Sequence, residues 1–72
     1  MDWIDCPVIE RVAGRMSGAP VVRNSRVRPE DLIGNLEEGP EWMAEAFGLP
    51  IDDVREVLAF YRLHQAELAS AP

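Results

Sequence analysis

The alternation of apolar and polar residues near the start of the chain predicts short β-strands. Residues 8–12 (VIERV) alternate and are rich in β-branched side chains, which is typical of a strand. Residues 17–20 (SGAP) form a turn cluster, residues 21–23 (VVR) suit a second strand, and residues 24–25 (NS) suit a further turn. We therefore expect a β-strand segment over residues 8–28.

After this segment the apolar positions change to helical spacing. Pro29 fits the first position of a helix, where the missing N–H costs no hydrogen bond, and the acidic pair after it complements the helix dipole. Leu32, Ile33 and Leu36 form an apolar stripe, so this helix is predicted to continue until Gly39.

Two further helices are predicted beyond Gly39. One begins at Pro40 and ends at Gly48, and the next begins at residues 51–53 (IDD) with an acidic first turn. The apolar positions of the last helix follow helical spacing along one face: Val54, Val57, Leu58, Tyr61 and Leu68. The expected fold is mainly α, with short N-terminal strands or a hairpin followed by a three-helix bundle over residues 29–69.

The last two helices carry the spacing of a helix-turn-helix. Ala44, Gly48, Val54 and Val57 read A-x3-G-x5-V-x2-V, in which alanine leaves room for the crossing helix, glycine makes the turn, and the valines pack the second helix on the first. An ordinary helical hairpin also favours glycine between its helices. The spacing by itself leaves both interpretations open.

The length of the chain favours a single domain over residues 1–72 that associates with another molecule. A chain of 72 residues buries a small core, and with one cysteine and one histidine it has no disulfide or structural metal site of its own. We expect a homodimer or larger oligomer that pairs through the strand segment. The interface residues predicted there are Val8, Val12, Val21 and Val22.

Charge divides the chain into two unlike parts. The net charge is −6, from seven arginines, no lysine and thirteen acidic residues. Residues 1–28 hold five arginines against three acidic residues (+2), whereas residues 29–72 hold two arginines against ten acidic residues (−8). Such a chain is a poor general binder of phosphate backbones, and its acidic part would suit an arginine-rich partner surface.

If the chain binds DNA, arginines must make the contacts. Arg55, on the predicted recognition helix, could pair with guanine, although Asp52, Asp53 and Glu56 surround it with negative charge. The other candidates, for phosphate contact, are Arg23, Arg26 and Arg28. For Arg23 and Arg26 two interpretations stay open: phosphate contact, with Arg26 alternatively clamping the turn, or surface ion pairs with acids of the helical part.

No catalytic, metal or cofactor site is predicted, so we expect no enzyme. His64 has no carboxylate–histidine pattern around it and is expected at the surface, and nothing lowers the pKa of Cys6, which is expected to be a small apolar side chain. Trp3 and Trp42 suit core or interface anchors better than nucleobase platforms. The sequence shows no basic leader followed by an apolar run and no membrane-length apolar stretch, so a cytoplasmic location is expected.

The ordered combination of these features resembles domain-of-unknown-function family 433. The family pattern G-x-P-V-I-x-G-T-R-I, followed by a helix and a helix-turn-helix, is matched by Gly18, Pro20, Val21, Val22, Arg26 and Val27. Asn24 and Ser25 replace the usual Gly-Thr, and asparagine also tolerates positive φ. The resemblance covers about residues 8–65.

The resemblance implies a small bacterial antitoxin with a homeodomain-like helix-turn-helix, which neutralises a toxin resembling PIN-class nucleases and binds its own operator as a dimer. Such proteins are commonly encoded beside the toxin and pair through their N-terminal strands. Two alternatives stay open: a stand-alone helix-turn-helix regulator, and an interaction module that does not touch DNA. Phe60 and Leu63 lie away from the predicted core stripe, so they are candidates either for toxin contact or for the dimer interface.

Overall fold

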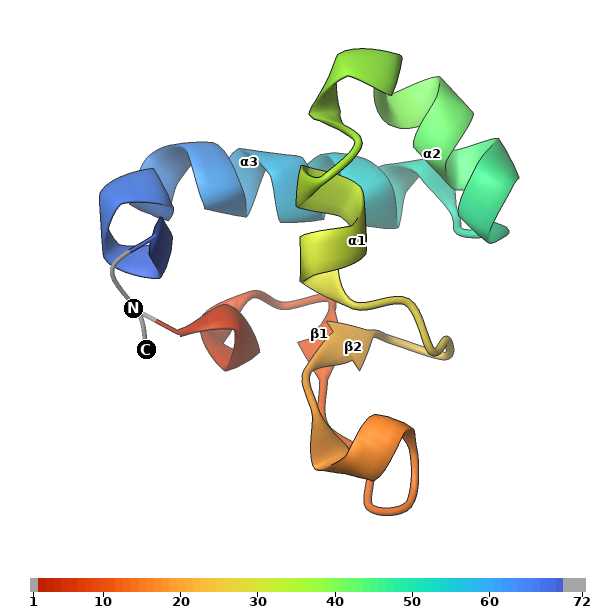
Figure 1. Ribbon diagram of the computed structural model, residues 1–72, viewed down its shortest axis with the longest axis vertical. Coiled ribbons are helices and arrows are strands. Elements are labelled where there is room, and N and C mark those ends of the chain that lie inside the picture. Colours follow the sequence, from red (N-terminus) through yellow and green to blue (C-terminus); the bar gives the residue numbers. More distant parts are fainter. Residues whose placement is uncertain (1, 70–72) are drawn as a thin grey trace.

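A small antiparallel hairpin lies beneath three helices in the computed structural model, which describes residues 2–69 and side chains as far as residue 65 (Figure 1). The hairpin consists of β1 (Ile9–Glu10) and β2 (Val21–Val22), with Ile9 opposite Val22 and Glu10 opposite Val21. The helices are α1 (Pro29–Ile33), α2 (Pro40–Phe47) and α3 (Ile51–Ala69). Three 3₁₀ turns complete the chain: η1 (Trp3–Asp5), η2 (Met16–Gly18) and η3 (Leu36–Glu38). The mainly helical fold with an N-terminal hairpin is therefore confirmed.

The strands are shorter than predicted because turns occupy the residues on both sides of each strand. The amide of Ile9 donates to the Cys6 carbonyl at 3.0 Å, and the amide of Arg15 donates to the Val12 carbonyl at 2.9 Å. These turns leave two residues in β1, and the bond from the Arg23 amide to the Val8 carbonyl extends the pairing by one step. A two-stranded hairpin this short is not stable by itself, so it depends on packing against the helices.

The first helix ends earlier than predicted. The α1 helix stops at Ile33, and its last carbonyls are satisfied by the Gly34 amide and by the Asn35 side-chain amide, which donates to the Asp31 carbonyl at 2.8 Å. The chain then turns into η3, which leaves Leu36 42% exposed rather than in the core. The prediction of one helix continuing to Gly39 was wrong because the Gly34–Asn35 pair caps the helix.

The turn between α2 and α3 forms as the helix-turn-helix spacing predicts. Gly48 has φ +68°, a left-handed conformation that favours glycine, and the Leu49 amide donates to the Ala44 carbonyl at 2.9 Å. Val54 and Val57 are fully buried, and Ala44 packs against the same core. The α2 and α3 helices therefore pack on each other through the predicted side chains.

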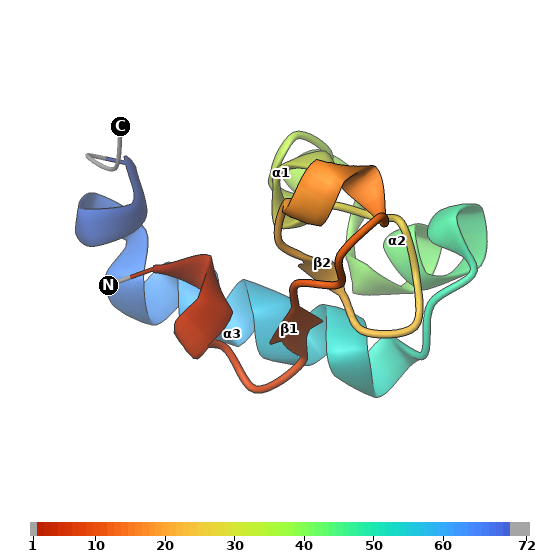
Figure 2. The ribbon, with the colours of Figure 1, turned by 90° about the horizontal axis from the view of Figure 1, so that it is seen from below.

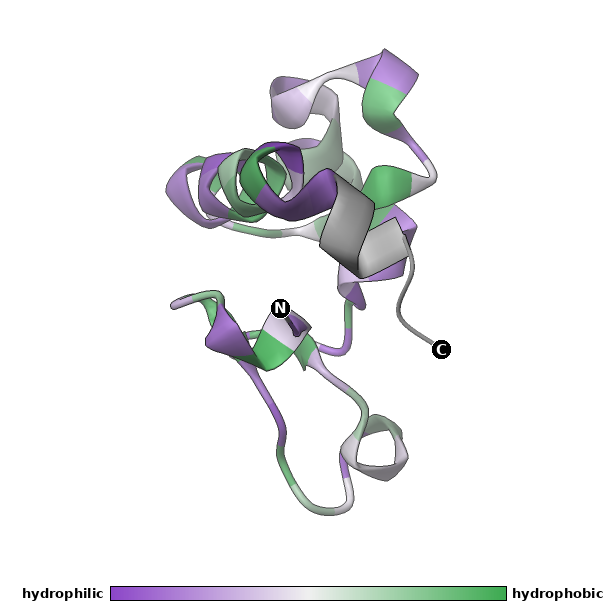
Figure 3. Cartoon of the chain, turned by 90° about the vertical axis from the view of Figure 1, so that its left-hand side faces the viewer, coloured by the Kyte–Doolittle hydropathy of each residue, from purple (hydrophilic) through white to green (hydrophobic). Residues whose placement is uncertain are grey.

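The core lies between the hairpin and the three helices. Its fully buried members include Val22 of β2, Leu32 of α1 and Met43 of α2. Viewed along α3 in Figure 3, the helix carries both hydrophobic and hydrophilic residues, as expected of a helix with one buried side. Figure 2 shows η1 lying along the second half of α3, where the Trp3 ring stacks on Tyr61 at 6.3 Å and packs on Phe60 at 5.6 Å.

Candidate functional site

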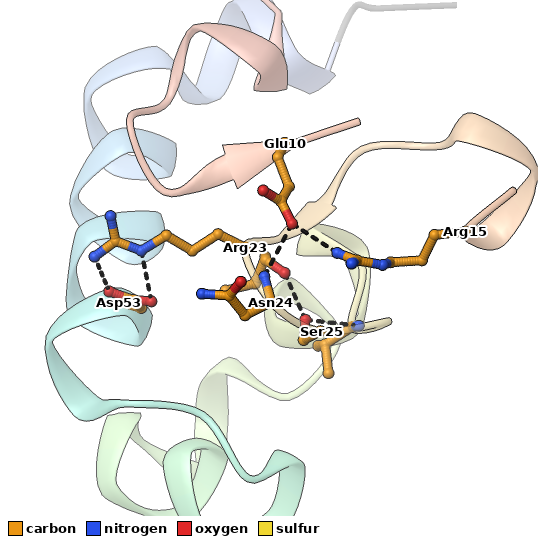
Figure 4. A network of polar contacts seen from close by, with 8 residues as sticks. Glu10, Arg15, Arg23, Asn24, Ser25 and Asp53 are labelled. Atoms are coloured by element: carbon orange, nitrogen blue, oxygen red, sulfur yellow. Dashed lines mark hydrogen bonds and ion pairs between the residues drawn. The ribbon is translucent and has the colours of Figure 1, made fainter. Parts of the chain in front are cut away.

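A bidentate ion pair connects the N-terminal end of α3 to the hairpin. Arg23, directly after β2, donates from Nε and Nη2 to the two carboxylate oxygens of Asp53 at 3.1 and 2.9 Å (Figure 4). The Asp53 side chain is only 6% exposed, whereas that of Arg23 is 52% exposed. The hydrogen bonds and negative charge of Asp53 raise the pKa of Arg23. Of the two interpretations of Arg23, this contact matches the ion pair with an acid of the helical part.

A second polar cluster fixes the turn after β2. Asn24 has φ +60°, the positive value that asparagine tolerates, and its backbone amide donates to the Glu10 carboxylate at 2.9 Å. The Ser25 hydroxyl donates to the Val22 carbonyl at 2.6 Å and accepts from the Val27 amide at 3.0 Å. The Asn-Ser pair therefore makes a tight turn here, which directs Arg23 toward α3.

Glu10 connects this turn to the loop between the strands, since its carboxylate accepts hydrogen bonds from Asn24 and Arg15. The Asn24 amide, and after it the Arg15 guanidinium at 2.6 Å, lower the pKa of Glu10. A lowered folded-state pKa contributes stability above the ordinary carboxyl pKa of 4.5, and this stability is lost as the pH falls through the folded value.

We therefore predict that Glu10→Gln lowers the urea midpoint at pH 7, because glutamine cannot supply the charged acceptor. The gap between wild type and variant should narrow steadily as the pH is lowered below about 4.5. Urea titrations at several pH values measure it. A gap that is the same at pH 3 and pH 7 would contradict the assignment.

The candidate DNA-binding arginines do not form one group. Arg55 lies on the exposed side of α3, and its Nη2 lies 3.5 Å from the Glu41 carboxylate of α2. Arg26 and Arg28 are exposed, and among the described side chains of residues 2–65 no ion pair reaches either guanidinium. Two of the four candidates thus contact acids of this chain, and two carry charge that no described acid balances.

The candidate interface residues also divide. Val8, Val21 and Val22 are buried in the core of the chain, so a dimer through this segment would use the strand backbone or Val12, which is half-buried. Phe60, expected to be exposed, is half-buried because Trp3 covers it. Leu63 is 79% exposed, as its spacing predicts.

Trp42 of α2, expected to be a core or interface anchor, lies at the surface and not in the core. Trp42 is 43% exposed, and its ring meets that of Phe47 edge-on at 6.2 Å. Met43, the next residue, is fully buried, so the helix directs Trp42 outward. The signal was present in the sequence: Trp42 lies between Glu41 and Glu45 on one side of a helix whose other side carries Met43 and Phe47.

The other two side chains considered as candidates, Cys6 and His64, are buried or half-buried. Cys6 is buried, and burial raises the pKa of its thiol, in agreement with an apolar role. His64 is half-buried rather than at the open surface; its ring lies at a tilt against that of Phe60, with the ring centres 4.7 Å apart, where α3 bends. Among the side chains described, those of residues 2–65, no group of histidine, cysteine and acidic residues could hold a metal ion. No helix in this described part is long and apolar enough to cross a membrane.

The architecture defines a small protein with a helix-turn-helix arrangement, in which the last helix, α3, is tied to an N-terminal hairpin. The family model described as protein of unknown function (DUF433) matches residues 9–61, from β1 to the middle of α3. The chain belongs to this family. No curated protein and no solved structure gives a match.

Proposed function

We propose that this protein is an antitoxin that neutralises a PIN-like nuclease toxin through the acidic surface of its helices. The observation that carries the proposal is the charge of residues 29–54, which hold eight acidic residues and no basic one. All but Asp53 are exposed. We call these seven the acidic helical surface: Glu30, Asp31, Glu37, Glu38, Glu41, Glu45 and Asp52.

The partner's chemistry follows from what a nuclease must do. A nuclease cleft holds RNA phosphates, so it is basic around its metal-binding carboxylates. An acidic surface is complementary to such a cleft, and complementarity speeds encounter and fixes orientation more than it adds affinity. Arg55 contacts Glu41 from α3, which leaves most of the acidic helical surface without a cation from its own chain among residues 2–65.

We predict that the chain co-purifies with the product of the adjacent gene and relieves its toxicity on co-expression. Replacing Glu37 and Glu38 by glutamine should slow association about tenfold at low salt, and much less at high salt. Stopped-flow association measures this. The control is Asp2→Asn/Asp5→Asn, which removes the charge of the residue before η1 and the charge of its last residue. The proposal would be contradicted if the adjacent gene product is not bound, or if the association rate constant does not change with salt concentration.

Operator binding is a second candidate function, favoured by the packed helix-turn-helix and the unbalanced charges of Arg26 and Arg28. If the chain binds DNA, Arg55→Ala should relax base preference by about 1–3 kcal/mol. Arg26→Ala should instead reduce the slope of log binding constant against log salt concentration by about one. Gel-shift titrations with the DNA upstream of its own gene test both. Identical binding by both variants and wild type would remove these arginines from any DNA contact.

A further inference from the structure

The outer side of α2 is an apolar and acidic face on which no other element of the described chain packs, although the Arg55 guanidinium reaches Glu41 at its edge. Four outward positions in two pairs, Glu41 with Trp42 and Glu45 with Ala46, are exposed, while Met43 on the other side is fully buried. A shallow depression is lined by three of them: Trp42, Glu45 and Ala46. We call these four residues the Trp42 face.

We propose that the Trp42 face is a docking surface for a basic amphipathic helix of a partner protein. This inference rests on the proposed function for the partner's identity, but not for the chemistry of the contact. An aliphatic side chain of the partner occupies the depression beside Trp42, and its arginines or lysines meet the surrounding carboxylates.

The apolar half of the recognition comes from Trp42. Tryptophan is enriched among the residues that dominate binding energy, because it buries a large, rigid surface. The edge-on contact with Phe47 holds the ring in place, and Ala46 is too small to fill the space beside it. Little side-chain entropy is therefore lost when a partner covers the indole.

The charged half comes from acids of α2 itself and of the neighbouring η3. Glu41 and Glu45 lie one turn apart on α2, and η3, which packs against α2 at the same end of the molecule (Figure 1), adds the exposed Glu37 and Glu38. Leu36 of η3 is also an exposed apolar side chain. A second copy of the same face would bring like charges together, so the occupant that fits is a basic one.

A synthetic peptide of about 18 residues, forming five turns of an amphipathic leucine–lysine helix, tests the proposal without the toxin. Titrated into ¹⁵N-labelled protein, it should give saturable amide shifts confined to residues 36–46. Trp42→Ala should weaken binding about tenfold, and Glu45→Lys should weaken it as well. The control Leu63→Ala, which removes the most exposed leucine of α3, should leave the affinity unchanged.

Shifts centred on Ile4 and Leu63, equal affinity for the Trp42→Ala variant, or equal binding of a leucine–glutamate peptide would each overturn the proposal. So would shifts at residues 36–46 that depend on protein concentration alone, since these would make a second copy the occupant. Circular dichroism of each variant confirms the fold. If the peptide binds as expected but the adjacent gene product does not, the antitoxin function fails and the docking surface stands.

Discussion

Leu32→Ala is expected to lower the free energy of unfolding by about 3 kcal/mol, which is a large part of the stability available to a domain this small. Leu32 is the fully buried leucine of α1, and its side chain lies in the core shared by the hairpin, α2 and α3. Truncation leaves a cavity that three packed elements cannot close without moving. Urea unfolding followed by circular dichroism measures the change.

The matched control is Leu36→Ala, four residues further along the chain. Periodicity places both leucines on one apolar stripe, yet Leu36 is 42% exposed because α1 ends before it. Its truncation should cost less than about 1 kcal/mol. Equal losses for the two variants would contradict the early end of α1, and a stability gain in Leu36→Ala would be compatible with it.

Arg23→Met is expected to destabilise the protein more than any other single arginine substitution. It leaves the Asp53 carboxylate buried without the guanidinium that donates both of its side-chain hydrogen bonds. Arg26→Met, at an exposed arginine in the same turn, is the control and should change stability by less than about 0.5 kcal/mol. Urea midpoints of the three proteins compare them directly.

The double variant Arg23→Met/Asp53→Leu separates the ion pair from simple loss of packing. Replacing both partners by apolar residues removes the buried charge along with its cation, so much of the lost stability should return. The single variant Asp53→Leu completes the comparison. If the stability lost by the double variant equals the sum of the losses of Arg23→Met and Asp53→Leu, the two side chains are not coupled. In that case the hairpin is held to α3 by its apolar contacts alone.

The start of each helix and the helix-turn-helix spacing could be predicted because their causes are local. Pro29 and Pro40 fix the backbone at a first helical position, and Gly48 supplies the left-handed turn. Val54 and Val57 are buried because helical periodicity puts them on one side of α3. Asn24 at positive φ belongs to the same class, since its own side chain tolerates the turn.

The candidate sites depended on contacts between residues far apart in sequence. Asp52 and Asp53 are neighbouring residues of the same type, but only Asp53 is buried. The fold brings Arg23, 30 positions earlier in the sequence, into contact with Asp53. Phe60 looked exposed until η1 placed Trp3 over it.

The sequence alone determined which residues can begin, end and line a helix, since propensity, capping and periodicity act over a few residues. Only the tertiary structure decided which outward side chains remain uncovered. Trp42 stays exposed with acids beside it, because no other element of the described chain packs on the outer side of α2.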